Sequence, residues 1–179
     1  PTRVTAPVIE KAARLKFIGR AGVAVDNIDV DAATKRGIVV MNSPRSNTIS
    51  TAEHTFAMML ALAREIPRAH HSVVAGKWTR DAFHGVELSG KVLGIVGLGR
   101  VGREVAARAV AFGMTVLAYD PVVSPANAWA AGAKLVDWKD LLVESDWITV
   151  HTPLETGTHA LIGATEIAVM KTGVFLINC

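Results

Sequence analysis

Short apolar runs alternate with amphipathic stretches along most of this chain. The runs at 92–96, 115–119 and 147–150 are rich in β-branched residues and poor in charge, as strands buried on both faces of a parallel sheet are. Apolar residues then recur three or four positions apart over 101–112, which is the period of a helix packed on such a sheet. The pattern predicts an α/β fold with a doubly wound parallel sheet.

The first 45 residues repeat this pattern on a smaller scale. We expect two helices, at 5–13 and 26–37, and two strands, at 15–18 and 38–41. Asp29 or Asn27 is placed to cap the second helix. The polar segment 43–47 breaks the pattern, so we place a domain boundary there, between a first domain at 1–45 and a second at 46–179.

A long helix is predicted over 50–63, and apolar residues on nearly all of its sides predict that it is buried almost all round. Pro67 interrupts it, and a second helical segment runs to about Ala75. We expect this pair of helices to join the two domains. The remaining elements are a helix near 127–131, a short strand at 134–136 and a strand at 174–177.

A glycine-rich turn follows the strand at 92–96. Gly97, Gly99 and Gly102 have the G-x-G-x-x-G spacing that allows a tight turn, a close approach of a pyrophosphate, and close packing of helix on strand. The residues between them, Arg100 and Val101, begin the helix, whose free N–H groups would face the phosphates. The strand, turn and helix together predict a dinucleotide site.

Asp120 ends the next strand, and 120 − 97 = 23 residues separate it from the first glycine. A carboxylate at that position accepts hydrogen bonds from ribose hydroxyls and repels the 2′-phosphate of NADP. No Lys or Arg occurs from Pro121 until Lys134, so no cation is evident for a 2′-phosphate. We therefore predict NAD as the cofactor.

Two further polar segments follow strands of the predicted sheet. His151, Thr152, Pro153 and Leu154 come after one strand, and Cys179 ends another. Ligands of doubly wound sheets bind beyond the carboxyl ends of the strands, so these residues are expected to border the cofactor. For His151 a purely structural position at the strand end is an equal alternative. Cys179 is expected to pack beside the cofactor and not to act as a nucleophile.

The loop Gly19-Arg20-Ala21-Gly22 admits two interpretations. Its backbone amides and the Arg20 side chain could bind an anion. Alternatively it is an ordinary turn from strand to helix, with Arg20 in a surface ion pair.

Composition excludes several functional classes. The net charge is +3 with scattered basic residues, which does not predict nucleic-acid binding, and no apolar run reaches the roughly 18 residues of a membrane span. One cysteine points to an intracellular, cytoplasmic protein. None of the six histidines has metal-ligand spacing, and the four tryptophans are expected to pack in the core or at its rim. The chain begins without Met and ends on a strand pattern, so we expect a fragment.

Together these motifs resemble the D-2-hydroxyacid dehydrogenases, most closely the members that act on 3-phosphoglycerate. The matching segments are Gly19–Gly22 with Asp26–Asp29, Gly37–Asn42, Gly97–Glu104, Tyr119–Pro121, His151–Leu154 and Ile177–Cys179. The resemblance implies a Rossmann-type NAD domain and part of a flavodoxin-like substrate domain. One departure is Ala24, where the family often has glycine.

The resemblance also implies roles for individual residues. Backbone amides of Arg20, Ala21 and Gly22 would bind the carboxylate of a small 2-hydroxy acid, and the Arg20 side chain a phosphate. Val23 and Cys179 would lie near the nicotinamide, and Thr152 and Pro153 near the adenine. The family's catalytic arginine, glutamate and histidine would lie outside residues 1–179, so this part binds NAD without turnover.

The activity implied is the oxidation of 3-phospho-D-glycerate to 3-phosphohydroxypyruvate in serine biosynthesis, by a homodimer or homotetramer. The alternatives are another D-2-hydroxyacid dehydrogenase, such as a glyoxylate or hydroxypyruvate reductase, and a non-enzymatic NAD-sensing module like the corepressors that share the fold. The helices over 50–78 are expected to form the dimer surface.

Overall fold

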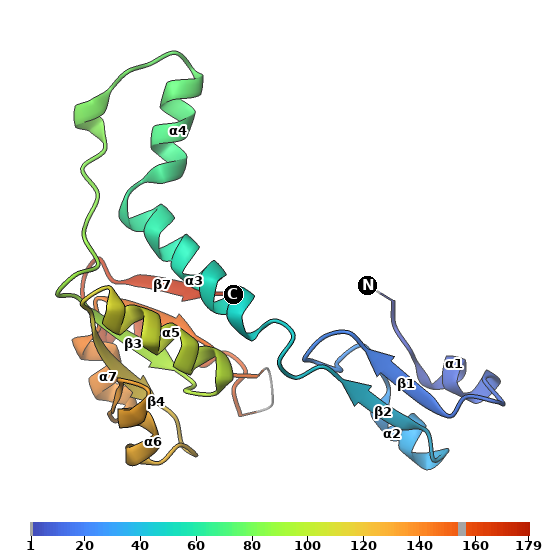
Figure 1. Cartoon of the computed structure of the whole chain (residues 1–179). Helices are drawn as coiled ribbons and strands as arrows, with labels where there is room; N and C mark the ends of the chain where they lie inside the picture. Colours follow the sequence, from blue (N-terminus) through green and yellow to red (C-terminus); the bar gives the residue numbers. More distant parts are fainter. Residues whose placement is uncertain (1, 154–156) are drawn as a thin grey trace. The chain divides into compact units, whose positions relative to one another are not determined.

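In the computed structural model, the chain divides after Thr48 into unit 1, Pro1–Thr48, and unit 2, Ile49–Cys179 (Figure 1). The structure describes residues 2–153 and 157–179. Each unit has its own sheet and its own buried apolar cluster, so each is described separately.

Unit 1 is a strand–helix–strand unit preceded by a short helix. Its elements are α1 (Ala6–Lys11), β1 (Phe17–Arg20), α2 (Val30–Lys35) and β2 (Val39–Asn42). The two strands are parallel, and Phe17 lies opposite Val39. All four predicted elements are present, although the first strand runs two residues further along the chain than predicted. Asp29 caps α2, because its carboxylate accepts a hydrogen bond from the Ala32 N–H at 2.9 Å.

Unit 2 contains a five-stranded parallel sheet with the order β5-β4-β3-β6-β7. The strands are β3 (Val92–Val96), β4 (Thr115–Tyr119), β5 (Lys134–Leu135), β6 (Trp147–Val150) and β7 (Phe175–Asn178). The helices are α3 (Thr48–Ala63), α4 (Ile66–Val74), α5 (Arg100–Ala111), α6 (Pro125–Ala130), α7 (Trp138–Glu144) and α8 (Ala164–Val169), with a 3₁₀ turn at Arg80–Ala82. The predicted bounds of β3, β4 and β6 are confirmed. The doubly wound parallel sheet is therefore also confirmed.

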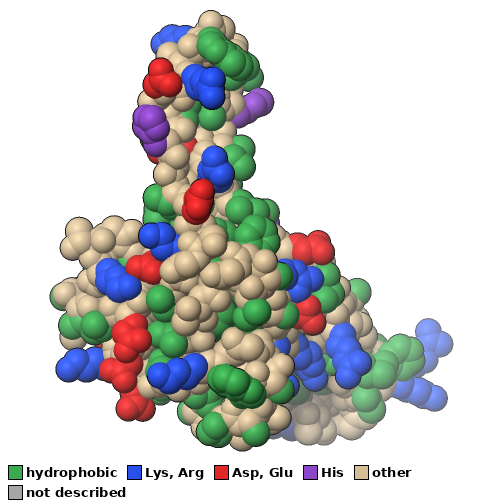
Figure 2. Space-filling model, turned by 60° about the vertical axis from the view of Figure 1, so that its left-hand side comes forward, with side chains coloured by type: hydrophobic (Ala, Val, Ile, Leu, Met, Phe, Trp, Pro, Cys, Tyr) green, Lys and Arg blue, Asp and Glu red, His purple; other side chains and the backbone are tan. Residues whose placement is uncertain are grey.

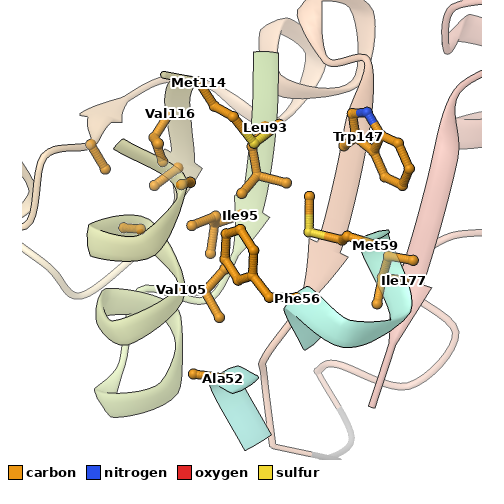
Figure 3. Close-up of a cluster of buried hydrophobic side chains, with 14 of the residues drawn as sticks. Ala52, Phe56, Met59, Leu93, Ile95, Val105, Met114, Val116, Trp147 and Ile177 are labelled. Carbon is orange, nitrogen blue, oxygen red and sulfur yellow. The ribbon is translucent and has the colours of Figure 1, made fainter. Parts of the chain in front are cut away.

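Alternating side chains of the strands enter two separate cores. Leu93 and Ile95 of β3 point to the face covered by α3 and α5, where Phe56, Met59 and Val105 pack on them (Figure 3). The next residue, Val96, enters the core beneath α7 on the opposite face. Strands buried on both faces need apolar residues at almost every position, which explains the uninterrupted apolar runs in the sequence.

The predicted all-round burial of the long helix is wrong. One face of α3 packs on the sheet, but Ile49 and Leu62 on its other side are each 47% exposed. No residue of α4 is buried, and this helix extends away from the sheet of unit 2 (Figure 1). Core or rim packing is likewise wrong for Trp78 and Trp129, which are 83% and 79% exposed. Only tertiary packing decides which apolar face of a surface helix is covered.

Candidate functional site

The strand order reverses between β3 and β6, which are neighbours in the sheet although β4 and β5 come between them in the sequence. At such a switch point the loops after the two strands separate and leave a crevice at the carboxyl ends. The loop after β3 is the glycine turn, and the loop after β6 begins with His151. The two loops touch, because a Cβ added to Gly97 would lie 3.0 Å from the carbonyl carbon and oxygen of His151.

Two of the three glycines are required by the protein itself. Gly97 has φ +91°, a left-handed conformation that residues with a Cβ rarely adopt. A Cβ on Gly102 would lie 2.2 Å from the Gly97 carbonyl oxygen, so helix and turn could not approach as they do. Gly99 is different, because a Cβ there meets no atom within 4 Å. The open space at Gly99 would let a ligand approach this backbone closely. A glycine turn with such an open position is suited to a pyrophosphate.

Helix α5 begins at this open position. Gly99 is its N-cap residue, and no side chain caps it. The first N–H groups of a helix lack partners within the helix and carry its positive partial charge. The amides of Arg100 and Val101 are therefore placed to bind an anionic group beside Gly99.

Asp120 is tied to the glycine turn by backbone hydrogen bonds. Its Oδ2 accepts from the Leu98 N–H at 2.8 Å, while Oδ1 accepts from the N–H groups of Val122 and Val123 at 2.9 and 3.1 Å. Partial burial by itself would raise the pKa of Asp120, but these N–H groups and the nearby Arg103 outweigh burial and lower that pKa below 3.8. The carboxylate is thus ionised at neutral pH. A carboxylate has about four acceptor positions, so about one is left for a ribose hydroxyl.

Arg103 is a residue that the sequence reasoning missed. No Lys or Arg lies between Pro121 and Lys134 in the sequence, yet Arg103 of α5 acts electrostatically on Asp120. Its Nε donates to the Leu98 carbonyl at 3.1 Å. Its position in the sequence could have indicated this role, because Arg103 lies in the first turn of the helix that follows the glycine turn.

The His151 side chain is partly buried and lies against Thr149 of the preceding strand. Its Nε2 lies 3.0 Å from Oγ1 of the buried Thr149, and its backbone N–H donates to Val96 at 2.8 Å. Burial lowers the pKa of His151 from 6.5 to about 4, because the charged imidazolium loses its hydration. At neutral pH the His151 ring is therefore uncharged and forms no ion pair with a phosphate.

A cleft of about 480 Å³ opens beyond the carboxyl ends of β6 and β7. Thr152 and Pro153 line one part of it, and Asn178 and Cys179 another. The Cys179 Sγ lies 3.8 Å from Met58 Sδ and 3.5 Å from Thr55 Oγ1, so Cys179 also contacts α3. Leu154, the last residue of the predicted segment, lies outside the described residues. The cleft brings together the two predicted segments that follow β6 and β7.

The Arg20 loop lies in unit 1, beside a hollow of about 270 Å³. The Arg20 Nη1 donates to the Asp26 carboxylate at 2.8 Å and also to the Ala24 carbonyl. The surface ion pair that was one of the two interpretations is therefore present. The Gly22 N–H donates to the Arg20 carbonyl at 3.0 Å, which leaves fewer loop amides for an external anion.

Val23 follows the loop and is joined to β2. Its carbonyl accepts a hydrogen bond from the Asn42 side-chain amide at 2.6 Å, and the Gly22 carbonyl accepts from the Ser43 N–H at 2.9 Å. These bonds fix the loop to the end of β2. The Val23 side chain stays exposed.

Within residues 2–153 and 157–179, no three His, Cys, Asp or Glu side chains are grouped so as to hold a metal ion. No helix in this described part of the chain is long and apolar enough to cross a membrane.

Comparison with known proteins identifies the fold and the motif. Residues 56–179 match the model of the NAD-binding domain of D-isomer-specific 2-hydroxyacid dehydrogenases. The D-3-phosphoglycerate dehydrogenase of Archaeoglobus fulgidus is 58% identical over 99% of this chain, and that of Bacillus subtilis is 53% identical over 99%. The chain spans about a third of these relatives, 34% of each.

A solved structure extends the comparison to the coordinates. The D-lactate dehydrogenase of Aquifex aeolicus, in complex with NAD and lactic acid, is 38% identical and superimposes with a TM-score of 0.87. The match covers 98% of this chain and 53% of that one. The chain belongs to the family of D-isomer-specific 2-hydroxyacid dehydrogenases, and it contains the family's NAD-binding domain.

Proposed function

We propose that the protein containing this chain uses NAD to oxidise 3-phospho-D-glycerate to 3-phosphohydroxypyruvate, the reaction that begins serine biosynthesis. The observation that carries the proposal is Arg20, a cation suited to a phosphate, on the loop of unit 1 beside the 270 Å³ hollow. Relatives named D-3-phosphoglycerate dehydrogenase cover almost the whole chain, which supports this substrate over unphosphorylated acids.

NAD would bind along the carboxyl ends of the strands of unit 2. Its pyrophosphate would lie on Gly99 and the amides of Arg100 and Val101, and its adenosine ribose beside Asp120. The nicotinamide supplies the hydride acceptor when the cofactor is bound. Within unit 2 the cofactor would also be bordered by Gly97, Gly102, His151, Thr152, Pro153 and Cys179.

The substrate would be held by unit 1. Amides of the Arg20–Gly22 loop would bind its carboxylate, and the Arg20 guanidinium its phosphate. His151 is neutral and bonded to Thr149, so it is not proposed as the acid–base group. By the family resemblance that group, with its glutamate partner and an arginine, belongs to a part of the protein outside residues 1–179.

The test is a kinetic comparison of the full-length enzyme with its Arg20→Ala variant. We expect Arg20→Ala to raise KM for 3-phosphoglycerate about tenfold or more, because a charged hydrogen bond to phosphate is lost. Oxidation of D-glycerate should change little. Arg14→Ala, at an exposed arginine of the same unit, serves as the matched control. Equal effects on both substrates would refute the phosphate assignment.

One observation favours a second candidate. Arg20 is already paired with Asp26. If Asp26 competed with a phosphate for Arg20, unphosphorylated glyoxylate or hydroxypyruvate would be the better substrate. Their reduction by NADH with higher kcat/KM than phosphohydroxypyruvate would support this alternative. Turnover of any of these acids would exclude the third alternative, a purely NAD-sensing module.

We also propose that the protein is a cytoplasmic homodimer or homotetramer. The support is the exposed apolar surface of α4 and the segment after it, where Ile66, Val73, Val74 and Trp78 are all more than half exposed. In the view of Figure 2 hydrophobic side chains stand among charged ones on this projecting segment. Such side chains are stabilised when a second copy covers them.

A further inference from the structure

The guanidinium of Arg20 uses one nitrogen for its contacts within the loop. Nη1 carries two hydrogens, and it donates to two acceptors, Asp26 Oδ1 at 2.8 Å and the Ala24 carbonyl. An arginine has five N–H donors in a planar fork. The three that remain are on Nε and Nη2, and the Nε–H with one Nη2–H forms an edge that pairs with two oxygens of a phosphate.

Gly22 lies beside the Arg20 side chain. A Cβ added to Gly22 would lie 3.5 Å from the Arg20 Nε, in ordinary van der Waals contact. Gly22 does not have a left-handed φ, so its conformation alone does not demand glycine.

The charges around the pair favour an anion. The Arg20 hydrogen bond is the largest cause that lowers the pKa of Asp26 below 3.8, and Arg3 contributes a smaller attraction. Asp26 is therefore ionised at neutral pH. Arg3 adds a second positive charge that acts on the same carboxylate.

We propose that Asp26 is a positioning residue for substrate recognition. Together with the Ala24 carbonyl, it holds Nη1 of Arg20 so that the Nε–Nη2 edge is presented to the phosphate of the substrate. The inference rests on the proposed function, in which Arg20 binds that phosphate. It resolves the two interpretations of the loop, because the ion pair and the anion site use different nitrogens of one guanidinium.

If Asp26 positions Arg20, residue 26 must supply an oxygen that accepts a hydrogen bond from Nη1, but that oxygen need not be negatively charged. Asp26→Asn keeps an oxygen that accepts from Nη1, whereas Asp26→Ala removes it. If Asp26 instead competed with the substrate for Arg20, both variants would bind phosphate more tightly, because each removes a repelling charge. The pair of variants thus separates positioning from competition.

The experiment compares kinetics of the full-length enzyme and its variants with 3-phosphoglycerate and with D-glycerate. We expect Asp26→Ala to raise KM for 3-phosphoglycerate about five- to twentyfold, the size of one lost charged hydrogen bond, with kcat unchanged. The KM of Asp26→Asn for 3-phosphoglycerate should stay within about twofold of the wild-type value. The KM for D-glycerate should change as little in every variant. Asp31→Ala, at an exposed aspartate of α2, is the matched control. An unchanged or lower KM in Asp26→Ala overturns the inference.

Calorimetric titration of the same proteins with inorganic phosphate separates the failure of this inference from failure of the proposed function. Phosphate binding that is lost in Arg20→Ala and weakened in Asp26→Ala supports the positioning role even if 3-phosphoglycerate is not oxidised. Wild-type protein that does not bind phosphate, or binds it equally well as Asp26→Ala, overturns the role whatever the substrate.

Discussion

Gly102 and Gly97 are in direct backbone contact: a Cβ on Gly102 would lie 2.2 Å from the Gly97 carbonyl oxygen. This contact sets how closely α5 approaches the end of β3, and hence where the helix N-terminus lies. Gly99 stands between the two glycines and has open space around its Cα. The three glycines of one motif therefore have different physical requirements, and substitution can separate them.

Gly102→Ala is expected to destabilise the protein by about 1–3 kcal/mol, because the added methyl group forces helix and turn apart. Gly99→Ala should be milder, about 0.5–1 kcal/mol, because glycine is a better N-cap than alanine but the added methyl group meets no other atom. It should nevertheless weaken NADH binding by roughly tenfold, because its methyl group occupies space proposed for the pyrophosphate. Urea unfolding and calorimetric titration with NADH measure the two effects. A Gly99→Ala variant with wild-type NADH affinity would contradict the pyrophosphate position.

Asp120→Ala should reduce the free energy of unfolding by about 1–3 kcal/mol, because three backbone N–H groups lose their acceptor. Asp120→Asn keeps one acceptor oxygen and should be affected less. Removing the charge should also raise NADPH affinity roughly tenfold relative to NADH, since repulsion of the 2′-phosphate ends and Arg103 remains.

Parallel titrations with NADH and NADPH check this prediction. The wild-type protein should bind NADH with clear preference. Equal binding of both cofactors by the wild type, or an unchanged ratio in Asp120→Asn, would show that Asp120 supports the turn without selecting the cofactor.

His151 should make stability depend on pH between 6.5 and about 4. Its pKa is lowered to about 4 in the folded protein, so in this window the unfolded chain binds more protons than the folded one. The free energy of unfolding therefore falls as pH falls, by about 2 kcal/mol from this residue after allowance for its partial exposure. Denaturant unfolding at pH 7, 5.5 and 4.5 should show this slope.

His151→Asn is expected to flatten the slope. Asp120 and Asp146 also have lowered pKa values, but their contributions are lost only below about pH 4, so they leave this window largely unaffected. An unchanged slope in His151→Asn would assign the acid sensitivity to other groups.

Trp78→Lys should shift the protein from dimer towards monomer in sedimentation experiments at micromolar concentration. The side chain is 83% exposed next to α4, so a lysine costs little in the free subunit but places a charge in the proposed interface. Trp129→Lys is the matched control, because Trp129 is similarly exposed but lies on α6. A wild-type mass of one chain would refute the dimer. Equal shifts in both variants would refute its proposed surface.

The local elements were largely predictable from sequence, because their signals are local. Strands β3, β4 and β6 are buried on both faces, so their apolar runs have sharp ends at the predicted residues. Helix α3 was predicted correctly in type but wrongly in burial. An apolar residue such as Leu62 shows that a helix has an apolar side, while coverage of that side depends on a partner distant in the sequence or on another chain.

The site was predictable where one segment supplies it and unpredictable where two segments meet. The glycine spacing and Asp120 could be read from the order of residues, since strand, turn and helix follow one another. The action of Arg103 on Asp120 and the pairing of Arg20 with Asp26 were decided by tertiary structure. The sequence by itself determined the buried strands and the cofactor motif, because periodicity and glycine spacing are properties of neighbouring residues. Only folding decided which charges neutralise one another, because that depends on distances across loops and strands.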